Sequence, residues 1–174
     1  MLEECDPSDG FYGALCAQIP VFEDRDRAAG RTIDLRVVVY PAFANDPQPD
    51  PVFVLAGGPG QGAAQASSGV VTALRKVREE RDIVFLDQRG TGESSGLDCD
   101  LDTDDLNLLF DEDLGIENLK RCLAGYDADL RHYTTPVAMD DLDQVREKLG
   151  YSKINLWGGS YGTRAAPPQR LILE

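Results

Sequence analysis

A serine set between two glycines, directly after a short apolar segment, restricts this chain more than any other feature. Residues 153–157 predict a buried strand, and residues 158–162 read Gly-Gly-Ser-Tyr-Gly. This pattern is typical of a sharp strand-to-helix turn, which closes only when the residues two before and two after the serine are small. Such a turn holds the serine in strained backbone and pushes its hydroxyl out over the end of the sheet. Ser160 is therefore the candidate nucleophile.

A second glycine-rich segment follows another predicted buried strand. Residues 52–56 are apolar, and residues 56–60 read Ala-Gly-Gly-Pro-Gly. The Gly-Lys-Ser or Gly-Lys-Thr of a phosphate-binding P-loop is absent, and the glycine spacing differs from that of a dinucleotide-binding turn. An oxyanion hole fits better, because backbone N–H groups of Gly58 and Tyr161 would converge on the oxygen that becomes negative in acyl transfer.

Strand and helix patterns alternate along the chain. Helices are predicted over residues 63–80, where apolar and charged positions oppose each other, and over 135–150, between Thr135-Pro136 and Gly150. Residues 1–30 are expected to be irregular. Four segments predict strands: 32–40, 52–56, 82–87 and 153–157. The order predicts an α/β fold with a mostly parallel central sheet flanked by helices.

Several motifs resemble those of one family. The matching segments run from Cys16 through 31–40, 56–60, 87–94, 133–136 and 140–142 to 158–165. They resemble the proline iminopeptidase family of α/β-hydrolases, and more closely its exported branch with tripeptidyl aminopeptidases. The family loop usually begins with His where this chain has Ala56, although Ala is familiar in the exported branch.

The resemblance implies an incomplete α/β-hydrolase fold and a serine aminopeptidase. Such an enzyme would release N-terminal residues, proline or short peptides, through an acyl-enzyme on Ser160. The mechanism requires no cofactor and suggests no metal. In the family, residues 87–94 shape the floor of the site, and Arg89 is expected to be structural rather than catalytic.

The catalytic triad is incomplete within the sequence. In α/β-hydrolases an Asp or Glu, and then a His, follow the nucleophile along the chain. Only fourteen residues follow Ser160, with Glu174 as their single acid and no histidine. His132, the one histidine, precedes the nucleophile and is expected to face solvent or to bond locally. Residues 1–174 are therefore interpreted as one partial domain that lacks the lid and the C-terminal part.

The sequence is compatible with three classes of function. The first is a serine aminopeptidase or related hydrolase that acts on a peptide or a small ester or amide. The second is a catalytically incomplete fragment that needs a second chain for the Asp and His. A secreted binding module would explain the cysteines but not the serine turn. Pro167-Pro168 interrupts the helix expected after Ser160, and residues 171–173 resemble a further strand. The missing strands, lid and helices would leave an exposed sheet edge, which would favour self-association or a complementing chain.

Composition argues against several partners. A net charge of −14 and a pI near 4.4 repel nucleic acids and anionic lipid surfaces. No apolar run approaches the roughly 20 residues of a membrane helix. The acidic stretch 97–115 lacks the Gly and Glu that an EF-hand calcium loop requires, so it is expected to be a solvated surface segment. The cysteine spacing and the single histidine argue against zinc.

The four cysteines form two pairs that are close in sequence, Cys5 with Cys16 and Cys99 with Cys122. Four cysteines allow three connectivities, and local disulfides are the simplest. Disulfides favour a secreted, periplasmic or cell-envelope protein, with cytoplasmic location as the alternative. The acidic N-terminus does not resemble a signal peptide, so export would require a signal that this chain does not carry.

Overall fold

The computed structural model describes residues 2–5, 13–99 and 112–165. The chain divides into two compact units, residues 1–96 with 131–174 and residues 97–130. The features expected at Pro167-Pro168, at residues 171–173 and at Glu174 lie outside the described residues, as does most of the acidic stretch.

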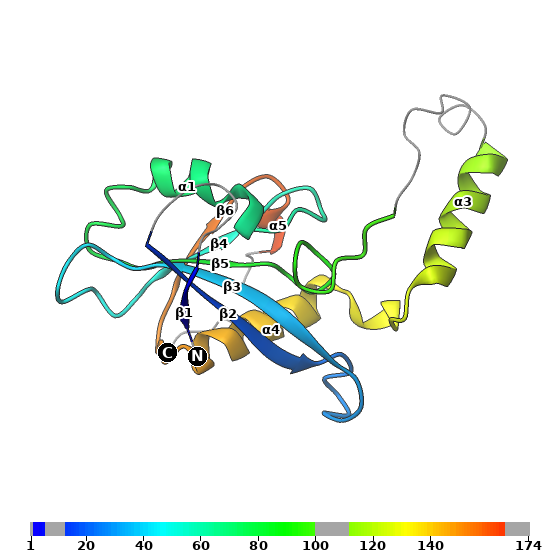
Figure 1. The fold of residues 1–174 in the computed structure, drawn as a ribbon, viewed down its shortest axis with the longest axis horizontal. Coiled ribbons are helices and arrows are strands. Elements are labelled where there is room, and N and C mark those ends of the chain that lie inside the picture. The colour runs from blue at the N-terminus through cyan, green and yellow to red at the C-terminus, as the bar shows by residue number, and fades with distance from the viewer. Residues whose placement is uncertain (1, 6–12, 100–111, 166–174) are drawn as a thin grey trace. The chain divides into compact units, whose positions relative to one another are not determined.

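The larger unit is built on a mixed six-stranded sheet (Figure 1). Its strands lie in the order β1-β2-β3-β5-β4-β6, and only β4 with β5 and β4 with β6 are parallel. The expected α/β architecture is present, but the sheet is not mostly parallel, because β2 returns directly onto β3 as a hairpin. The strands are β1 Glu3–Cys5, β2 Ala14–Phe22, β3 Thr32–Tyr40, β4 Val52–Leu55, β5 Ile83–Leu86 and β6 Asn155–Gly158.

The N-terminal strands correct the prediction that residues 1–30 are irregular. Strand β2 buries Ile19 and Val21 on one face, where they lie opposite Leu35 and Ile33 of β3. Pro20 sits inside this run, and proline within an alternating pattern argues against a strand. Pro20 therefore obscures the alternation, and pairing with β3 supplies the tertiary contacts that stabilise the strand.

The predicted helix over residues 63–80 is too long. It is a short 3-10 turn, η1 Ala64–Ala66, followed by α1 Ser67–Ala73. Residues 74–80 form turns instead, where the Arg78 Nε donates to the carbonyl of Pro41 at 3.0 Å. The same guanidinium stacks 4.4 Å from the centre of the Phe43 ring. These tertiary contacts override the helical pattern.

The second predicted helix is confirmed as α4 Thr135–Lys148. Thr134 takes the N-cap position, one residue before the one predicted, and Pro136 lies in the first turn. Gly150, just beyond the helix, adopts φ +84°, a conformation that glycine accepts without steric cost.

Helices cover both faces of the sheet (Figure 1). Leu142 and Val145 of α4 pack with Phe53 in one core cluster. Val71 of α1 packs with Phe85 in the other. These faces explain why β4 and β5 are buried along their whole length.

Strand β6 differs from its prediction as a buried strand. In the described ranges it pairs with β4 alone, and it is half-buried, with Asn155 exposed. It stands at the edge of the sheet, and its outer side has no strand partner among those residues. An edge position keeps one row of backbone groups available for pairing.

The smaller unit holds helix α3 Glu112–Gly125, which was not predicted. A disulfide joins Cys99 to Cys122, with the two Cα atoms 5.7 Å apart. The hydroxyl of Tyr126 lies 3.4 Å from the Cys99 sulfur and 3.3 Å from the Cys122 sulfur. In the part of the chain that the structure describes, no helix is long and apolar enough to cross a membrane.

Candidate active site

The predicted site residues Gly58, Ser160 and Tyr161 follow two of three neighbouring parallel strands, β4 and β6. Val54 of β4 lies in register with Phe85 of β5 and with Trp157 of β6. The carboxyl ends of the three strands therefore meet at one edge of the sheet, the usual position of ligand sites in α/β folds. The loops at that edge carry Gly58, Asp87 and Ser160.

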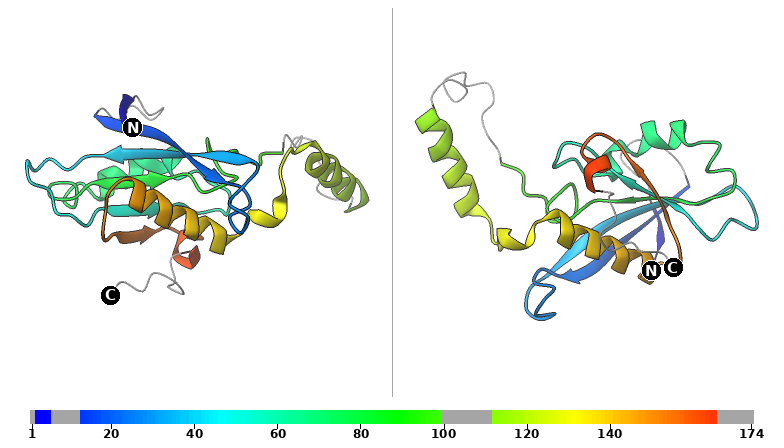
Figure 2. Two further views of the ribbon diagram at one scale, coloured as in Figure 1. Left: turned by 90° about the horizontal axis from the view of Figure 1, so that it is seen from below. Right: turned by 180° about the vertical axis from the view of Figure 1, so that it is seen from behind.

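Strand β6 leads into the short helix α5 Gly162–Ala165, drawn in orange to red in Figure 2. Ser160 lies in the strained turn between them. Its φ is +51°, in the left-handed region that a non-glycine residue rarely enters. The side chain is exposed. The Ser160 carbonyl accepts from the Thr163 N–H at 3.1 Å and from its hydroxyl at 2.6 Å, which closes the turn. The strain and the exposure agree with the geometry predicted for a nucleophile.

The two flanking glycines are dictated by close backbone packing. A Cβ on Gly158 would lie 2.7 Å from the carbonyl carbon of Gly162. A Cβ on Gly162 would collide with the carbonyl oxygen of Leu55, at the end of β4. The Leu55 carbonyl also accepts from the Gly159 N–H at 3.2 Å. The serine turn is thus pressed onto the strand that leads into the other glycine-rich loop.

That loop lies directly against Ser160. A Cβ on Gly57 would lie 3.1 Å from the Ser160 Cβ and 3.6 Å from its hydroxyl oxygen. Gly58 has φ +103°, and a Cβ there would lie 2.9 Å from the Gly60 nitrogen. Within the described residues, the N–H groups of Gly58 and Tyr161 donate to no other backbone group. An oxyanion hole requires donors that are not already engaged in this way.

The side chain of Tyr161 is tied to helix α4. Its phenolic oxygen lies 2.7 Å from the Thr135 hydroxyl oxygen, at the first residue of that helix. The contact fixes the residue that follows the candidate nucleophile. It thereby limits the directions in which the Tyr161 N–H can point.

Asp87 joins the 57–64 loop to the loop that follows β5. Its side chain is 1% exposed. One carboxylate oxygen accepts from the Ala64 N–H at 2.8 Å, and the other accepts from the Glu93 N–H at 3.0 Å. Burial raises the pKa of Asp87, and these two hydrogen bonds oppose the rise.

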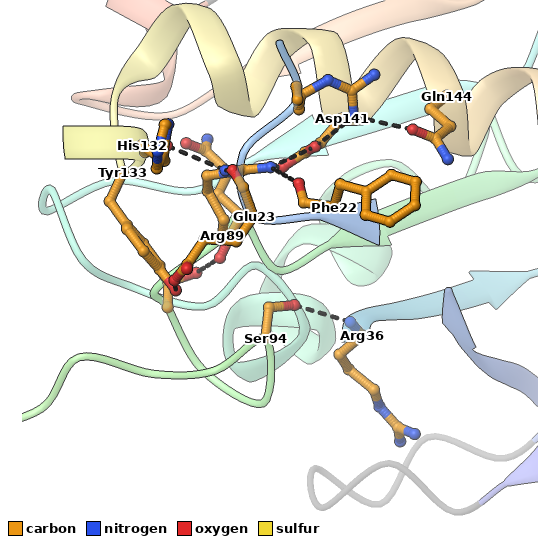
Figure 3. Close-up of polar contacts among 12 residues, drawn as sticks. Phe22, Glu23, Arg36, Arg89, Ser94, His132, Tyr133, Asp141 and Gln144 are labelled. Carbon is orange, nitrogen blue, oxygen red and sulfur yellow. Dashed lines mark hydrogen bonds and ion pairs between the residues drawn. The ribbon is translucent and has the colours of Figure 1, made fainter. Parts of the chain in front are cut away.

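Arg89 lies at the centre of a buried polar cluster (Figure 3). Its Nε and Nη2 donate hydrogen bonds to the two carboxylate oxygens of Asp141, at 2.6 and 2.8 Å. The remaining donors bind three backbone carbonyls, those of Phe22 at 3.2 Å, Glu23 at 2.9 Å and His132 at 3.0 Å. Every bond made by this guanidinium is internal, in keeping with the structural role expected for it.

The same cluster includes Glu23 and Tyr133. The Tyr133 hydroxyl donates to the Glu23 carboxylate at 2.9 Å. Burial, helped by this carboxylate, raises the pKa of Tyr133 to about 12. The phenol is therefore neutral at physiological pH and acts as a donor. Arg25 adds a second cation on Asp141, at 2.7 Å.

His132 belongs to this cluster. Its Nε2 lies 3.9 Å from the Asp24 carboxylate, and its carbonyl accepts from Arg89. This local environment agrees with the expectation that His132 is not the base for Ser160.

Cys5 and Cys16 are joined by a disulfide that links β1 to β2, with Cα atoms 5.7 Å apart. The two pairings in the structure are the local ones. Within residues 2–5, 13–99 and 112–165, no group of three or more His, Cys, Asp and Glu side chains is arranged to hold a metal ion.

Two residues of this region had no chemical signal in the sequence. Asp87 and Thr135 both lie in segments that carried the family resemblance, but neither stood out as a site residue. The useful sign was position, since Asp87 directly follows a buried strand. An acid at that edge of the sheet is a candidate site residue.

Comparisons with known proteins point to one family. A family model described as the alpha/beta hydrolase fold matches residues 50–166. The serine protease Hip1 of Mycobacterium tuberculosis is 32% identical over 168 residues, covering 87% of this chain and 32% of the relative. The putative hydrolase YuaR of Escherichia coli is 26% identical over 118 residues, covering 66% of this chain and 24% of the relative. The chain thus spans about a third of the first relative and about a quarter of the second.

Among solved structures, the proline iminopeptidase of Mycobacterium smegmatis superimposes with a TM-score of 0.49 at 19% identity, covering 86% of this chain and 37% of that one. VinJ gives a TM-score of 0.48 at 20% identity, covering 86% of this chain and 37% of that one.

Proposed function

This chain belongs to the α/β-hydrolase fold family, and from that premise we propose that Ser160 is the nucleophile of a serine hydrolase. The observation that carries the proposal is the φ of +51° at Ser160, with glycines pressed against backbone on either side. A fold that maintains such strain only to make a turn would be unusual, whereas strained residues concentrate at functional sites.

The reaction we propose is acyl transfer. The Ser160 Oγ forms a bond to the substrate carbonyl carbon, and its proton passes to a general base. The N–H groups of Gly58 and Tyr161 stabilise the negative oxygen of the tetrahedral intermediate. The leaving amine departs with the proton, and water then hydrolyses the acyl-enzyme.

The base must come from outside the described site. The sequence has one histidine, His132, and its surroundings are those of the Arg89 cluster. We propose that the Asp and His of the triad are supplied by a further segment or by a second chain. The open side of β6 is a suitable place for such a segment to pair, because it lies beside the nucleophile turn.

The substrate we propose is a peptide with a free N-terminus. The product released from that end would be proline or a short peptide. The support is the resemblance of the motifs to serine aminopeptidases, together with the serine protease among the relatives. The net charge of −14 would also attract a protonated α-amine. The two disulfides support export, because such bonds persist in oxidising compartments.

The test is labelling with a fluorophosphonate probe, which reports an activated serine without assuming a substrate. We expect slow labelling of the chain alone, accelerated by added imidazole as a replacement base. Ser160→Ala should abolish the labelling, while Ser152→Ala, at an exposed serine in the turn before β6, should not change it. Labelling that persists in Ser160→Ala would contradict the assignment. Rapid labelling without imidazole would show that a base is already in place, for example from a second copy.

The aminopeptidase assignment has a separate test, run on protein that labels rapidly. Arylamides of proline and of a tripeptide should be cleaved, and the same compounds with an acetylated N-terminus should not. Equal cleavage of the acetylated compounds would leave a serine hydrolase but exclude an aminopeptidase.

A further inference from the structure

Asp87 is a buried carboxylate for which the proposed reaction has no use. It is 1% exposed, and its oxygens are held by two backbone N–H groups rather than by a cation. Taking an ionised carboxylate out of water is costly unless its oxygens are well bonded. Burial accordingly raises its pKa, with Arg36 acting only as the weakest of the influences on it. The burial of this carboxylate therefore points to a structural role for Asp87.

The two bonds of Asp87 join loops that are distant in sequence. Ala64 ends the loop that begins at Gly57, and Glu93 lies in the loop that follows β5. The carboxylate fills the space between those loops. A Cβ on Gly62 would lie 2.9 Å from one carboxylate oxygen, and a Cβ on Gly92 would collide with the other.

The first of these loops is the one that abuts the nucleophile. A Cβ added to Gly57 would lie only 3.1 Å from the Ser160 Cβ. The loop is therefore fixed at one end by β4 and at the other by the Ala64 bond to Asp87. A small displacement would move the Gly58 N–H relative to the substrate oxygen, and oxyanion donors act only at hydrogen-bond distance.

We propose that Asp87 is a positioning residue that clamps the 57–64 loop, so that the Gly58 N–H is aimed at the oxyanion formed on attack by Ser160. This inference rests on the proposed function for its catalytic part. It assigns to Asp87 no contact with substrate and no proton transfer.

The variant that tests the clamp is Asp87→Asn. Its carboxamide has the same shape but only one accepting oxygen, so one of the two N–H groups would face an NH₂ donor. The matched control is Asp82→Asn, at the opposite end of β5. The Asp82 carboxylate likewise accepts from a backbone N–H, that of Ala42 at 2.8 Å, and from the Tyr151 hydroxyl at 2.7 Å.

Two readouts are measured on each protein. The first is hydrogen exchange of the Ala64 and Glu93 backbone amides, whose N–H groups are bonded to the Asp87 carboxylate. Asp87→Asn should raise these rates about tenfold or more, and Asp82→Asn should leave them unchanged. The second is imidazole-assisted fluorophosphonate labelling of Ser160. Its maximal rate should fall about tenfold or more in Asp87→Asn, with little change in the probe concentration that gives half of that rate.

A second variant protects the test against misfolding of the first. Gly62→Ala keeps the carboxylate but places a methyl group against it and 3.0 Å from the Gly92 Cα. It should give the same two effects.

The outcomes separate the clamp from the proposed function. Wild-type protein that does not label, even with imidazole, contradicts the role of Ser160, and the exchange rates then decide the clamp alone. Labelling of wild-type protein with equal rates in Asp87→Asn and Gly62→Ala would overturn the catalytic part of the inference. Unchanged amide exchange in both variants would overturn the clamp itself.

Discussion

The hydroxyl of Thr135 lies 2.7 Å from the phenolic oxygen of Tyr161, so the first residue of helix α4 is bonded to the residue that follows the candidate nucleophile. The bond joins segments that are 26 residues apart. It ties the start of α4 to the residue whose N–H is the proposed oxyanion donor.

Replacing Thr135 with Val should slow acylation of Ser160. The variant keeps the side-chain shape and removes one neutral hydrogen bond, which contributes about 0.5–1.5 kcal/mol. If that energy orients the Tyr161 N–H, the maximal labelling rate should fall about 2–10-fold. Tyr161→Phe should have the same effect, and the double variant should add nothing further. Thr72→Val, at an exposed threonine that bonds within α1, is the control, and strictly additive effects would contradict the coupling.

The glycine at the start of α5 should resist substitution. In Gly162→Ala the new methyl group would collide with the Leu55 carbonyl, which belongs to rigid strand backbone. We expect a loss of about 2–3 kcal/mol in the free energy of unfolding, measured by urea denaturation. Gly69→Ala is the control, because a Cβ there meets nothing within 4 Å. A Gly162→Ala protein as stable as the wild type would show that the turn can relax.

The Arg89 cluster should contribute strongly to stability. Arg89→Met leaves Asp141 buried with Arg25 alone and removes the donors to three carbonyls. Breaking a buried ion pair in this way costs about 3–5 kcal/mol. Arg27→Met is the control, because it removes a surface ion pair with Asp24 in which 83% of the Arg27 side chain is exposed. The free energy of unfolding should fall by less than about 1 kcal/mol in this variant. Similar losses in the two variants would mean that the buried cluster contributes little.

Asp87 should make stability fall as pH rises. Burial raises its pKa in the folded protein above the 3.8 of an unperturbed Asp. Between these two values the folded state binds more protons than the unfolded state, so the free energy of unfolding decreases with increasing pH and then levels off above the folded pKa. Asp87→Asn lacks this titration. The stability of wild-type protein relative to the variant should therefore decline as pH rises from about 4, and a rise instead would contradict the burial effect.

The disulfides can be tested by peptide mapping. Trypsin without reductant should release residues 90–120 and 122–131 as one linked species through Cys99 and Cys122. Residues 1–25 should carry the Cys5 to Cys16 bond internally and gain two hydrogens on reduction. Four free thiols in protein recovered from an oxidising compartment would refute the argument for export.

Local sequence determined the elements whose pattern needs no partner. The strand at 32–40 and the helix that begins at Thr135 were predicted because apolar spacing and flanking turn residues are local properties. The glycines around Ser160 were informative for the same reason, since a strained turn requires small residues wherever it occurs. The sequence also indicated the family, and with it the role that we propose for Ser160.

Tertiary structure decided what depends on contacts between distant segments. Strand β2 forms against β3 although Pro20 obscures its pattern, and the helix after Ala63 ends early because Arg78 bonds to Pro41. The clamp by Asp87 and the bond from Thr135 to Tyr161 join residues 23 and 26 positions apart. No local pattern encodes such pairs, because the hydrogen bond that gives each residue its role exists only after the sheet has brought its partner within reach.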